Sequence, residues 1–345
     1  MTPFFSLILP CYNVEAYVAR CVHSILVQDC KDYEIILVDD GAKDGTPAIC
    51  DRLAEAHACI RVLHKENGGL ASARNAGLEM ARGQYVWFID SDDWINPGAL
   101  EKLRQVCLTS GADIVKFDYL RVSTALKQVS GIIPAGGYVG AADIAPLCRS
   151  ALCRAGKYSL SAWSHVYRRA FLEEHGLRFV SERVICSEDY LFNLQALMHV
   201  QTLQVLSEPL YSYELRPGSL TQTYKPDLAD RYGELHRQLT TYVEQLGREK
   251  EYGPLIDRFY VWHLIAGTCI PHEYHAEQPM AQARQHVRRL LKSPDVKKAA
   301  RRSDRQGLSW RKQLQRLALQ CGFEPLFYYL HVVKPHRAGV KRLKE

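Results

Sequence analysis

Several features that would assign the chain to other protein classes are missing from its 345 residues. No run of about 18 apolar residues occurs without a charged residue or a proline, so we expect no segment that crosses a bilayer. Residues 1–6 lack the basic region and the cleavage site that are typical of a secretory signal. The 11 cysteines are scattered and never form a Cys-x-x-Cys pair, which argues against a disulfide framework or a zinc site and favours the reducing cytoplasm.

Two common phosphate-binding fingerprints are also missing. The pair Gly68-Gly69 belongs to neither GxxxxGK[ST] nor GxGxxG, which weighs against a kinase, an ATPase or a nicotinamide-dependent enzyme. What is present is an ordinary globular composition, with 47% hydrophobic and 24% charged residues, and this excludes a wholly disordered chain. The length suggests two domains, or one large domain with additions.

The charges are distributed unevenly along the chain. Residues 281–345 contain 17 Lys and Arg against 4 Asp and Glu, whereas residues 1–280 contain 27 basic and 34 acidic residues. The net charge of +6 therefore combines an acidic body with a strongly basic tail. Such an asymmetry indicates an anionic partner for the tail, either a membrane or a nucleic acid.

Short apolar runs alternate with amphipathic segments over the first 120 residues. The apolar runs predict strands at residues 5–9, 33–38, 60–63, 85–89 and 113–117. The amphipathic segments predict helices at residues 14–27, 46–57, 71–81 and 97–109, with Thr46 as the N-cap of the second. This alternation predicts an α/β fold with a mostly parallel sheet covered on both faces, and the chain past about residue 226 reads as helices only.

Polar residues follow each of these predicted strands. In a parallel sheet the ligand binds at the carboxyl ends of the strands, so these residues are expected to meet at one edge. They lie in the segments 10–13, 39–41, 67–75 and 90–93.

Each of these segments has a functional and a purely structural interpretation. Asp90-x-Asp92 provides two carboxylates suited to Mg²⁺ or Mn²⁺ with diphosphate oxygens, or else a solvated turn in which Asp93 caps the next helix. Asp39-Asp40 provides acceptors for a uracil or a ribose, or else a simple turn. Gly68-Gly69 is either a turn or a place where ligand phosphates approach the backbone.

Taken together, these segments closely resemble bacterial family 2 glycosyltransferases of the GT-A fold. The resemblance covers about the first 100 residues, in which five motifs occur in the expected order: residues 6–15, 24–28, 34–41, 67–77 and 83–93. It implies a nucleoside-diphosphate-sugar donor, most often linked to UDP, and a divalent cation, Mn²⁺ or Mg²⁺. It also implies a donor site formed by Pro10, Tyr12 and Glu15 around the nucleotide, Asp40 at the uracil imide, Gly68 and Asn75 nearby, Asp90 at the ribose or sugar, and Asp92 at the metal.

The middle of the chain adds further motifs that are similar to those of the family. Trp163 and Tyr167 match a Trp-x-x-x-Tyr-Arg segment, and Arg216 belongs to a loop expected to close over the donor phosphates. Glu188-Asp189 resembles the catalytic pair that opens a helix, with Asp189 as the general base and Glu188 contacting the acceptor or orienting the pair. Without the resemblance, the same pair reads as favourable charge in the first turn of a helix.

We therefore expect a GT-A catalytic domain at residues 1–225, with a nucleotide-sugar-binding half (1–120) and an acceptor half (121–225), and a helical region at 226–345. The expected activity is inverting transfer of a hexose or N-acetylhexosamine from a UDP-sugar to a saccharide or lipid-linked acceptor in bacterial surface polysaccharide synthesis, such as capsule, O-antigen or exopolysaccharide. The basic amphipathic tail favours peripheral attachment to the inner face of the cell membrane over a helical cap on the catalytic domain, and no nucleic acid is expected. The alternatives are a non-catalytic nucleotide-sugar-binding scaffold and a sugar-1-phosphate nucleotidyltransferase.

Overall fold

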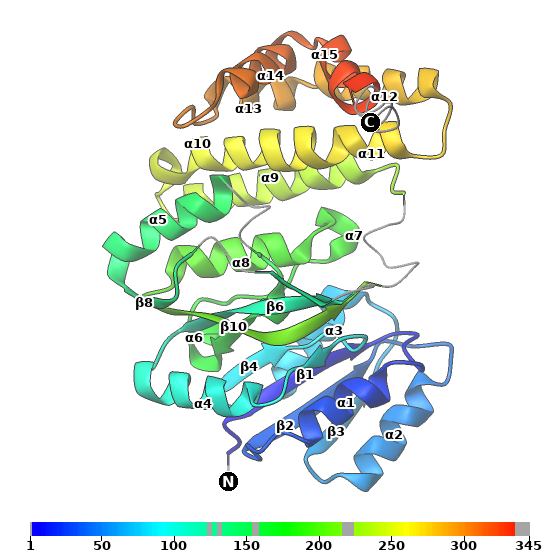
Figure 1. The fold of residues 1–345 in the computed structure, drawn as a ribbon, viewed down its shortest axis with the longest axis vertical. Helices are drawn as coiled ribbons and strands as arrows, with labels where there is room; N and C mark the ends of the chain where they lie inside the picture. Colours follow the sequence, from blue (N-terminus) through cyan, green and yellow to red (C-terminus); the bar gives the residue numbers. More distant parts are fainter. Residues whose placement is uncertain (1, 123–125, 130–132, 154–158, 216–223, 335–345) are drawn as a thin grey trace, which may run out of the picture. The chain divides into compact units, whose positions relative to one another are not determined.

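A computed structural model of the chain describes residues 2–122, 126–129, 133–153, 159–215 and 224–334 (Figure 1). The chain divides into two units, Met1–Ser219 and Leu220–Glu345. The first unit contains a mixed β-sheet with helices on both faces, and the described part of the second is helical. The prediction of a nucleotide-sugar half and an acceptor half within the first unit stays a prediction.

Four parallel strands form the N-terminal part of the sheet, in the order β3-β2-β1-β4. They are β1 (Phe5–Cys11), β2 (Tyr33–Asp39), β3 (Ile60–His64) and β4 (Tyr85–Phe88). Every residue of β1, β2 and β4 is buried, in agreement with their continuous apolar sequences. The strands predicted for this region are confirmed to within two residues at each end.

The rest of the sheet joins this parallel part through one antiparallel strand. Strand β9 (His165–Arg168) lies between β4 and β6 (Ile114–Val122) and is antiparallel to both, whereas β6 is parallel to β10 (Thr202–Glu214). Three short strands pair antiparallel with β6 or β10: β5 (Trp94–Ile95), β7 (Leu126–Val129) and β8 (Gly136–Val139). The carboxyl ends of β1, β2, β4, β6 and β10 are the strand ends at which a ligand is expected.

The four helices predicted in the first 120 residues are confirmed, with two local corrections. They are α1 (Val18–Leu26), α2 (Thr46–Ala56), α3 (Leu70–Met80) and α4 (Ala99–Ser110). The first begins at Val18 instead of Val14. The predicted N-cap Thr46 is wrong by one position: Gly45 precedes the helix, and the Thr46 hydroxyl instead accepts a hydrogen bond from the amide of Val14 at 2.9 Å.

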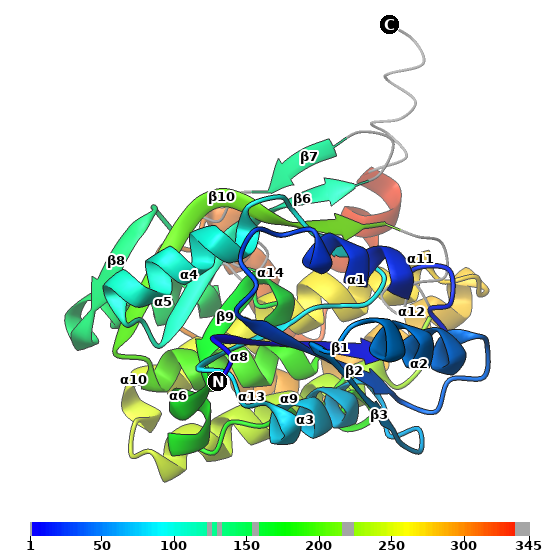
Figure 2. The ribbon, with the colours of Figure 1, turned by 90° about the horizontal axis from the view of Figure 1, so that it is seen from below.

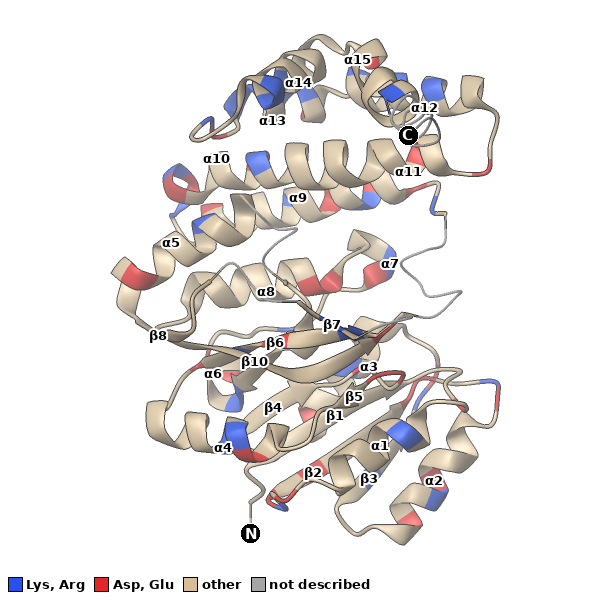
Figure 3. Cartoon of the chain, in the orientation of Figure 1, with Lys and Arg blue, Asp and Glu red and all other residues tan. Residues whose placement is uncertain are grey.

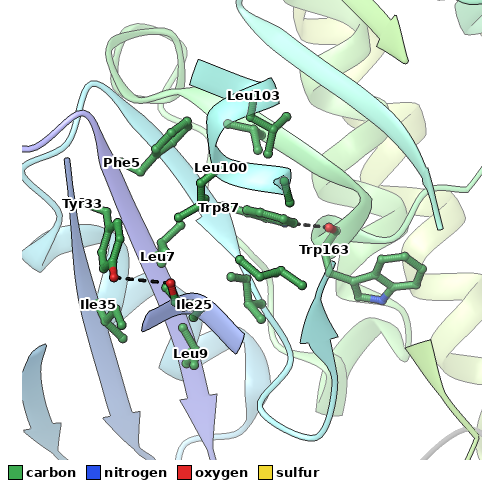
Figure 4. Packing of buried hydrophobic residues seen from close by; sticks show 14 of the residues in the cluster. Phe5, Leu7, Leu9, Ile25, Tyr33, Ile35, Trp87, Leu100, Leu103 and Trp163 are labelled. Carbon is green, nitrogen blue, oxygen red and sulfur yellow. Dashed lines mark hydrogen bonds between the residues drawn. The ribbon is translucent and has the colours of Figure 1, made fainter. Parts of the chain in front are cut away.

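Helices α1, α2 and α4 cover one face of the sheet. Their apolar side chains join alternate residues of the strands, such as Phe5, Leu7 and Trp87, in a continuous core (Figure 4). The indole of Trp87 donates a hydrogen bond to the carbonyl of Trp163 at 2.7 Å, which ties this core to the segment before β9. The core therefore joins the N-terminal strands to the middle of the chain.

The opposite face of the sheet carries α3 and α8 (Glu188–His199). Figure 2 shows α1 and α3 on opposite sides of β1 and β2. On this face Phe88 of β4 lies edge-to-face against Phe192 of α8, with ring centroids 6.1 Å apart. The remaining helices of the unit are α5 (Gly140–Cys153), η1 (Ala162–Ser164), α6 (Arg169–Glu174) and α7 (Glu182–Ile185). Because α3 and α8 share one face, their N-terminal residues can meet at the carboxyl edge of the sheet.

The described part of the second unit consists of helices, as the sequence predicts for the chain past residue 226. They are α9 (Leu228–Gln245), α10 (Glu249–Phe259), the π-helical η2 (Tyr260–Cys269), α11 (Ile270–His275), α12 (Met280–Lys292), α13 (Pro294–Arg302), α14 (Trp310–Cys321), α15 (Glu324–Tyr328) and the π-helical η3 (Tyr329–Val333). None of the helices in the described ranges is both long enough and apolar enough to cross a membrane.

The close approach of α3 to β1 generates a stability prediction. A Cβ atom at Gly77 would lie 2.3 Å from Cγ2 of Ile8 and 3.2 Å from Cγ2 of Val38. Gly77→Ala should therefore lower the free energy of unfolding by about 1–3 kcal/mol, because the steric cost exceeds the gain in helix propensity. The control Gly233→Ala, in α9, would place its Cβ 3.8 Å from the nearest atom and should not destabilise the protein. Denaturant titration measures both changes, and equal stabilities for the two variants would contradict the packing argument.

Candidate active site

Arg74 is the centre of the candidate site. It lies on the buried face of α3, between Ala71 and Gly77, and its side chain is only 1% exposed. Its Nη2 donates to Oδ1 of Asp90 at 2.9 Å, and its Nη1 donates to Oε1 of Glu188 at 2.9 Å and to Oδ1 of Asp189 at 2.7 Å. One guanidinium thus joins the carboxyl end of β4 to the first turn of α8.

The charges in this cluster do not balance. Three carboxylates surround one cation, so the cluster keeps an excess of negative charge when all of its members are ionised. Burial and the neighbouring Asp189 raise the pKa of Glu188 to about 8, although Arg74 opposes the shift. Burial also raises the pKa of Asp189, again against Arg74, and the charge of Asp90 adds to the rise. Burial alone would lower the pKa of Arg74, but the carboxylates hold it above its ordinary value.

A strained turn sets the direction in which α8 begins. The amide of Ser187 donates to the carbonyl of Ile185 at 2.9 Å, which closes a γ-turn around Cys186. Cys186 has φ +67° and ψ −44°, a conformation that side-chain-bearing residues rarely adopt and that costs about 1–3 kcal/mol. This turn immediately precedes Glu188 and Asp189, so the surrounding structure maintains the strain at the site.

Two contacts hold the segment before α8 against α3. The Asn75 side chain makes two hydrogen bonds to the backbone of Phe179, at 2.8 and 2.9 Å. The Glu182 carboxylate accepts from the amides of Leu70 and Ala71, at 3.1 and 3.2 Å, at the start of α3. Asn75, predicted to lie in the donor site, is thus engaged with the backbone of Phe179.

The acidic loop after β4 contains Asp92 and Asp93, which have different environments. Asp92 is half-buried, and its carbonyl accepts from Arg20 of α1 at 2.7 Å. Asp93 is fully buried and accepts from the hydroxyl of Tyr211 at 2.6 Å and from the amide of Glu214 at 2.8 Å. The interpretation of Asp93 as a helix cap is therefore wrong: Gly98 precedes α4, and Asp93 instead fixes the end of β10 to this loop.

The residues predicted to surround the nucleotide lie at the ends of β1 and β2. The carbonyl of Pro10 accepts from the Ser91 hydroxyl at 2.6 Å, which connects β1 to the acidic loop. Tyr12 is 48% exposed, and Glu15 accepts from the amide of Gly45 at 2.6 Å. These side chains lie at the expected edge of the sheet.

Asp40 is buried and forms a second polar cluster. Its Oδ1 accepts from Nζ of Lys65 at 2.6 Å and from the amide of Gly68 at 3.0 Å, and its Oδ2 accepts from the amide of Gly69 at 2.8 Å. A carboxylate offers about four acceptor positions, so one position on Oδ2 is left after these three bonds. The amide of Gly68, predicted to approach ligand phosphates, is engaged with Asp40.

The aromatic motif of the middle segment lies next to Asp93. The Trp163 ring is stacked on Tyr211 and Tyr213, with ring centroids 4.7 and 5.6 Å apart, and Tyr167 donates to Asn193 of α8 at 2.7 Å. These contacts join β9, β10 and α8 beside the acidic residues. Arg216, predicted at the donor phosphates, lies outside the described residues.

The carboxylates of the acidic loop are possible ligands for a divalent cation. Among the described residues, no group of three or more His, Cys, Asp or Glu side chains is arranged to hold a metal ion. Mg²⁺ and Mn²⁺ are often held by one or two carboxylates together with substrate phosphates and water, and the acidic loop provides such carboxylates beside a cluster with surplus negative charge. Asp92, with Asp90 beside it, therefore fits a cation that arrives with a diphosphate.

Arg74 lies in one of the segments expected at the strand ends, but the sequence predicts no role for it. A signal was present, because residues 71, 74 and 77 share one face of a helix and the two neighbours are small. A cation between two small residues on a face directed at the sheet indicates a buried charge that needs carboxylate partners. Tyr211 begins the motif that contains Arg216, but nothing in the sequence predicts its contact with Asp93, since the two residues are 118 positions apart.

Removing the buried cation should have an effect on stability that depends on pH. Arg74→Met leaves three carboxylates without their partner, one buried (Glu188) and two partly buried (Asp90 and Asp189), and should lower the free energy of unfolding by about 3–5 kcal/mol at pH 8. The loss should be smaller at pH 5, because the carboxyl group of Glu188, whose pKa is raised to about 8, is protonated there and no longer carries an uncompensated charge.

Denaturant titration at the two pH values measures this difference. Arg178→Met is the matched control, because Arg178 is partly exposed and pairs with Glu173 at 2.7 Å; its effect should stay below about 1 kcal/mol at both pH values. An equal loss for Arg74→Met at pH 5 and pH 8 would contradict the charge argument.

With this geometry established, the chain can be compared with known proteins. The family "Glycosyl transferase family 2" matches residues 6–132. An uncharacterized glycosyltransferase of Bacillus subtilis (strain 168), EpsJ, is 30% identical over 307 residues, which are 87% of each chain. Poly(ribitol-phosphate) beta-N-acetylglucosaminyltransferase TarS of Staphylococcus aureus (strain Mu50) is 29% identical over 213 residues, which cover 61% of this chain and 35% of TarS.

A solved structure shows the same fold. The crystal structure of residues 1–349 of S. aureus TarS in complex with UDP-GlcNAc matches with a TM-score of 0.72 and 20% sequence identity, over 97% of this chain and 92% of the TarS chain. This likeness confirms the predicted GT-A fold with a helical C-terminal region. The identity and coverage of the B. subtilis relative show that the chain belongs to glycosyltransferase family 2 and is a glycosyltransferase.

Proposed function

We propose that the chain is an inverting, metal-dependent transferase that moves a hexose or N-acetylhexosamine from a UDP-sugar to a saccharide acceptor in bacterial surface polysaccharide synthesis. The observation that carries the proposal is the bridge formed by Arg74 between Asp90 and the pair Glu188-Asp189. It brings the predicted donor-binding strand end and the predicted catalytic base into one cluster. The crystal structures of S. aureus TarS in complex with UDP-GlcNAc and with UDP support a UDP-linked donor.

The proposed reaction is a single displacement at the anomeric carbon. The acceptor hydroxyl attacks the face opposite the departing diphosphate, a new C–O bond forms as the bond to the diphosphate breaks, and the hydroxyl proton passes to Asp189. The Asp189 side chain is 19% exposed, against 9% for Glu188, so it is the better placed of the two to reach an acceptor. Its raised pKa suits a general base that must take up a proton.

Arg74 acts in this scheme as a positioning residue. It holds Asp189 and Asp90 at fixed distances, so the base and the sugar-binding carboxylate are oriented before substrates arrive. Glu188 shares the same guanidinium nitrogen as Asp189 and orients the pair. In this scheme the nucleotide lies along Pro10, Tyr12, Glu15 and Asp40, and the remaining acceptor position of Asp40 accepts from the uracil imide. Gly68 supports the site through its bond to Asp40, and Asn75 through its bonds to the backbone of Phe179.

A divalent cation, Mn²⁺ or Mg²⁺, completes the proposed site. Asp92 would hold it, with Asp90 nearby, and the ion supplies Lewis-acid stabilisation of the charge on the departing diphosphate. Arg216 would add a second positive charge there. The surplus of carboxylates around Arg74 supports this part of the proposal, because it favours a bound cation.

We further propose that the second unit attaches the enzyme to an anionic membrane that carries a lipid-linked acceptor. On α14 the apolar side chains of Trp310, Leu314 and Leu317 are 66, 49 and 49% exposed, next to the cations Arg311 and Lys312. Figure 3 shows further Lys and Arg positions on α12 and α13. Exposed apolar residues flanked by cations favour binding at a lipid surface, with each cation near the surface contributing about 1 kcal/mol.

The donor and metal assignment predicts a specific thermal response. UDP together with Mn²⁺ should raise the Tm by about 2–4 °C, because a ligand that binds only the folded state stabilises it. Asp92→Ala should remove most of this shift, whereas Asp29→Ala, which removes an equal charge from an exposed position, should retain it. Differential scanning fluorimetry measures the shift. The absence of any shift in the folded wild-type protein would refute the proposed donor class.

The assignment of Asp189 as the general base predicts that a substitution there abolishes turnover without affecting the binding of UDP. Asp189→Asn keeps an oxygen that can accept from Arg74 but cannot take up the acceptor proton, so kcat should fall at least about 100-fold while the thermal response to UDP is retained. UDP release with a panel of UDP-sugars and saccharide acceptors measures turnover. Asp51→Asn, at a side chain that is 55% exposed, is the control and should turn over normally. Turnover of Asp189→Asn at the wild-type rate would rule out Asp189 as the base.

A further inference from the structure

The second unit contains a buried cation for which no partner is found among the described residues. Arg316 of α14 is 9% exposed, and its Nε and Nη1 atoms are buried without a hydrogen-bond acceptor in the described part of the chain. A buried guanidinium without a carboxylate is costly, and native structures keep such groups paired. The absence of an acceptor for the Arg316 guanidinium in the described part of the chain therefore indicates a position at which a bound anion would stabilise the protein.

Two further cations lie close to Arg316. Lys312 is one helical turn earlier on α14, and its ammonium lies 5.7 Å from the centre of the Trp262 ring, whose buried Nε1 also has no acceptor within the described ranges. Arg305 lies near enough for its charge to act on Arg316: burial first, and then the charge of Arg305, lower the pKa of Arg316. The cluster thus combines three positive charges with an unused indole N–H.

The two acidic residues nearest to Arg316 in the sequence, Asp304 and Glu324, are already engaged with other cations, and so is Asp257. Asp304, next to Arg305, binds Arg258 at 2.9 Å, and Asp257 binds Arg302 at 2.8 Å. Glu324 binds Arg284 at 2.8 Å. None of the ion pairs found in the described part of the second unit includes Arg305, Lys312 or Arg316.

This side of α14 faces α13. Gln320, one turn after Arg316, donates to the carbonyl of Ala300 at 3.0 Å near the end of α13, and Arg305 follows the same helix. The three cations therefore come from α14 and from the segment that follows α13, two parts of the chain that are joined where α13 and α14 pack, and Arg316 lies near both of the others.

We propose that Arg316, with Lys312 and Arg305, forms a binding site for a phosphate group. A phosphate offers several acceptor oxygens and one or two negative charges, which match the unused guanidinium donors and the surplus cations. The site is separate from the transfer chemistry of the first unit. It adds a defined ligand position to the proposed membrane surface, and the phosphate comes either from a lipid headgroup or from a soluble phosphate.

The first experiment measures the Tm of the full chain in phosphate and in chloride at equal pH and ionic strength. Phosphate should raise the Tm of the wild-type protein by about 2–4 °C and should leave Arg316→Met unchanged. Arg311→Met is the matched control: it removes the same charge from the same helix at an exposed residue that lies over Trp310, and it should keep the phosphate response. Phosphate bound at the catalytic site would act equally on all three proteins.

The Tm values in chloride show whether the variants fold, and two results of the comparison with phosphate would overturn the proposal. In chloride, Arg316→Met should be at least as stable as the wild-type protein, because the substitution removes an unpaired buried charge, and Arg316→Gln should behave similarly. Equal phosphate responses in wild type and Arg316→Met would overturn the site. Loss of the response in Arg311→Met as complete as in Arg316→Met would also overturn it, since general charge would then explain the binding.

A second experiment separates the two sources of phosphate. Flotation with vesicles of phosphatidylglycerol and phosphatidylcholine compares the two variants. Weaker flotation of Arg316→Met than of Arg311→Met, with competition by inorganic phosphate, assigns the site to a lipid headgroup. Equal flotation of the variants, with the thermal phosphate response still confined to proteins that keep Arg316, assigns it to a soluble phosphate.

Discussion

The buried guanidinium of Arg74 is the interaction on which the candidate active site depends. A cation with 1% exposure is stable only if acceptor groups replace its water. Here these groups are carboxylates from the loop after β4 and from the start of α8, as far as 115 positions away in the chain. The requirement acts in both directions, because Asp90, Glu188 and Asp189 approach one another only with a cation between them. The same contacts of Arg74 therefore hold α8 against the N-terminal part of the sheet and form the site.

The contacts around this cluster preserve its geometry. Asn75 holds Phe179, Glu182 holds the first amides of α3, and the γ-turn at Cys186 directs α8 back toward Arg74. The three carboxylates around Arg74 still carry more negative charge than one cation balances. This excess can be relieved in two ways: a carboxyl group can take up a proton, as the raised pKa of Glu188 indicates, or the cluster can bind a cation. A general base needs a raised pKa, and a diphosphate leaving group needs a bound cation. The excess of negative charge therefore favours both the proton transfer and the departure of the diphosphate in the proposed reaction.

The sequence predicts the parts of this structure that depend on local pattern. The alternation of apolar runs and helices fixes the strands of the N-terminal half, and the positions after those strands contain most of the predicted site residues. What it does not predict are contacts between distant residues. Asp93 reads as a helix cap because Pro97 follows, but its partners Tyr211 and Glu214 come from β10. Thr46 reads as an N-cap, but its hydroxyl is used by Val14, across the edge of the sheet. In both cases a side chain suited to a local hydrogen bond finds a distant donor.

The basic tail shows that the number of charged residues in a sequence does not predict which of them are paired in the structure. Counting residues gives a large positive charge for residues 281–345, and the count treats all cations alike. In the structure Arg284 and Arg302 are neutralised by Glu324 and Asp257, so they hold helices together and are not available to a partner. Among the described residues Arg316 has no such carboxylate, and its burial makes the missing negative charge costly, whereas an exposed cation such as Arg311 is stabilised by water. The affinity of the tail for an anion therefore depends less on the number of its cations than on their surroundings. Cations that are buried without a carboxylate partner contribute most.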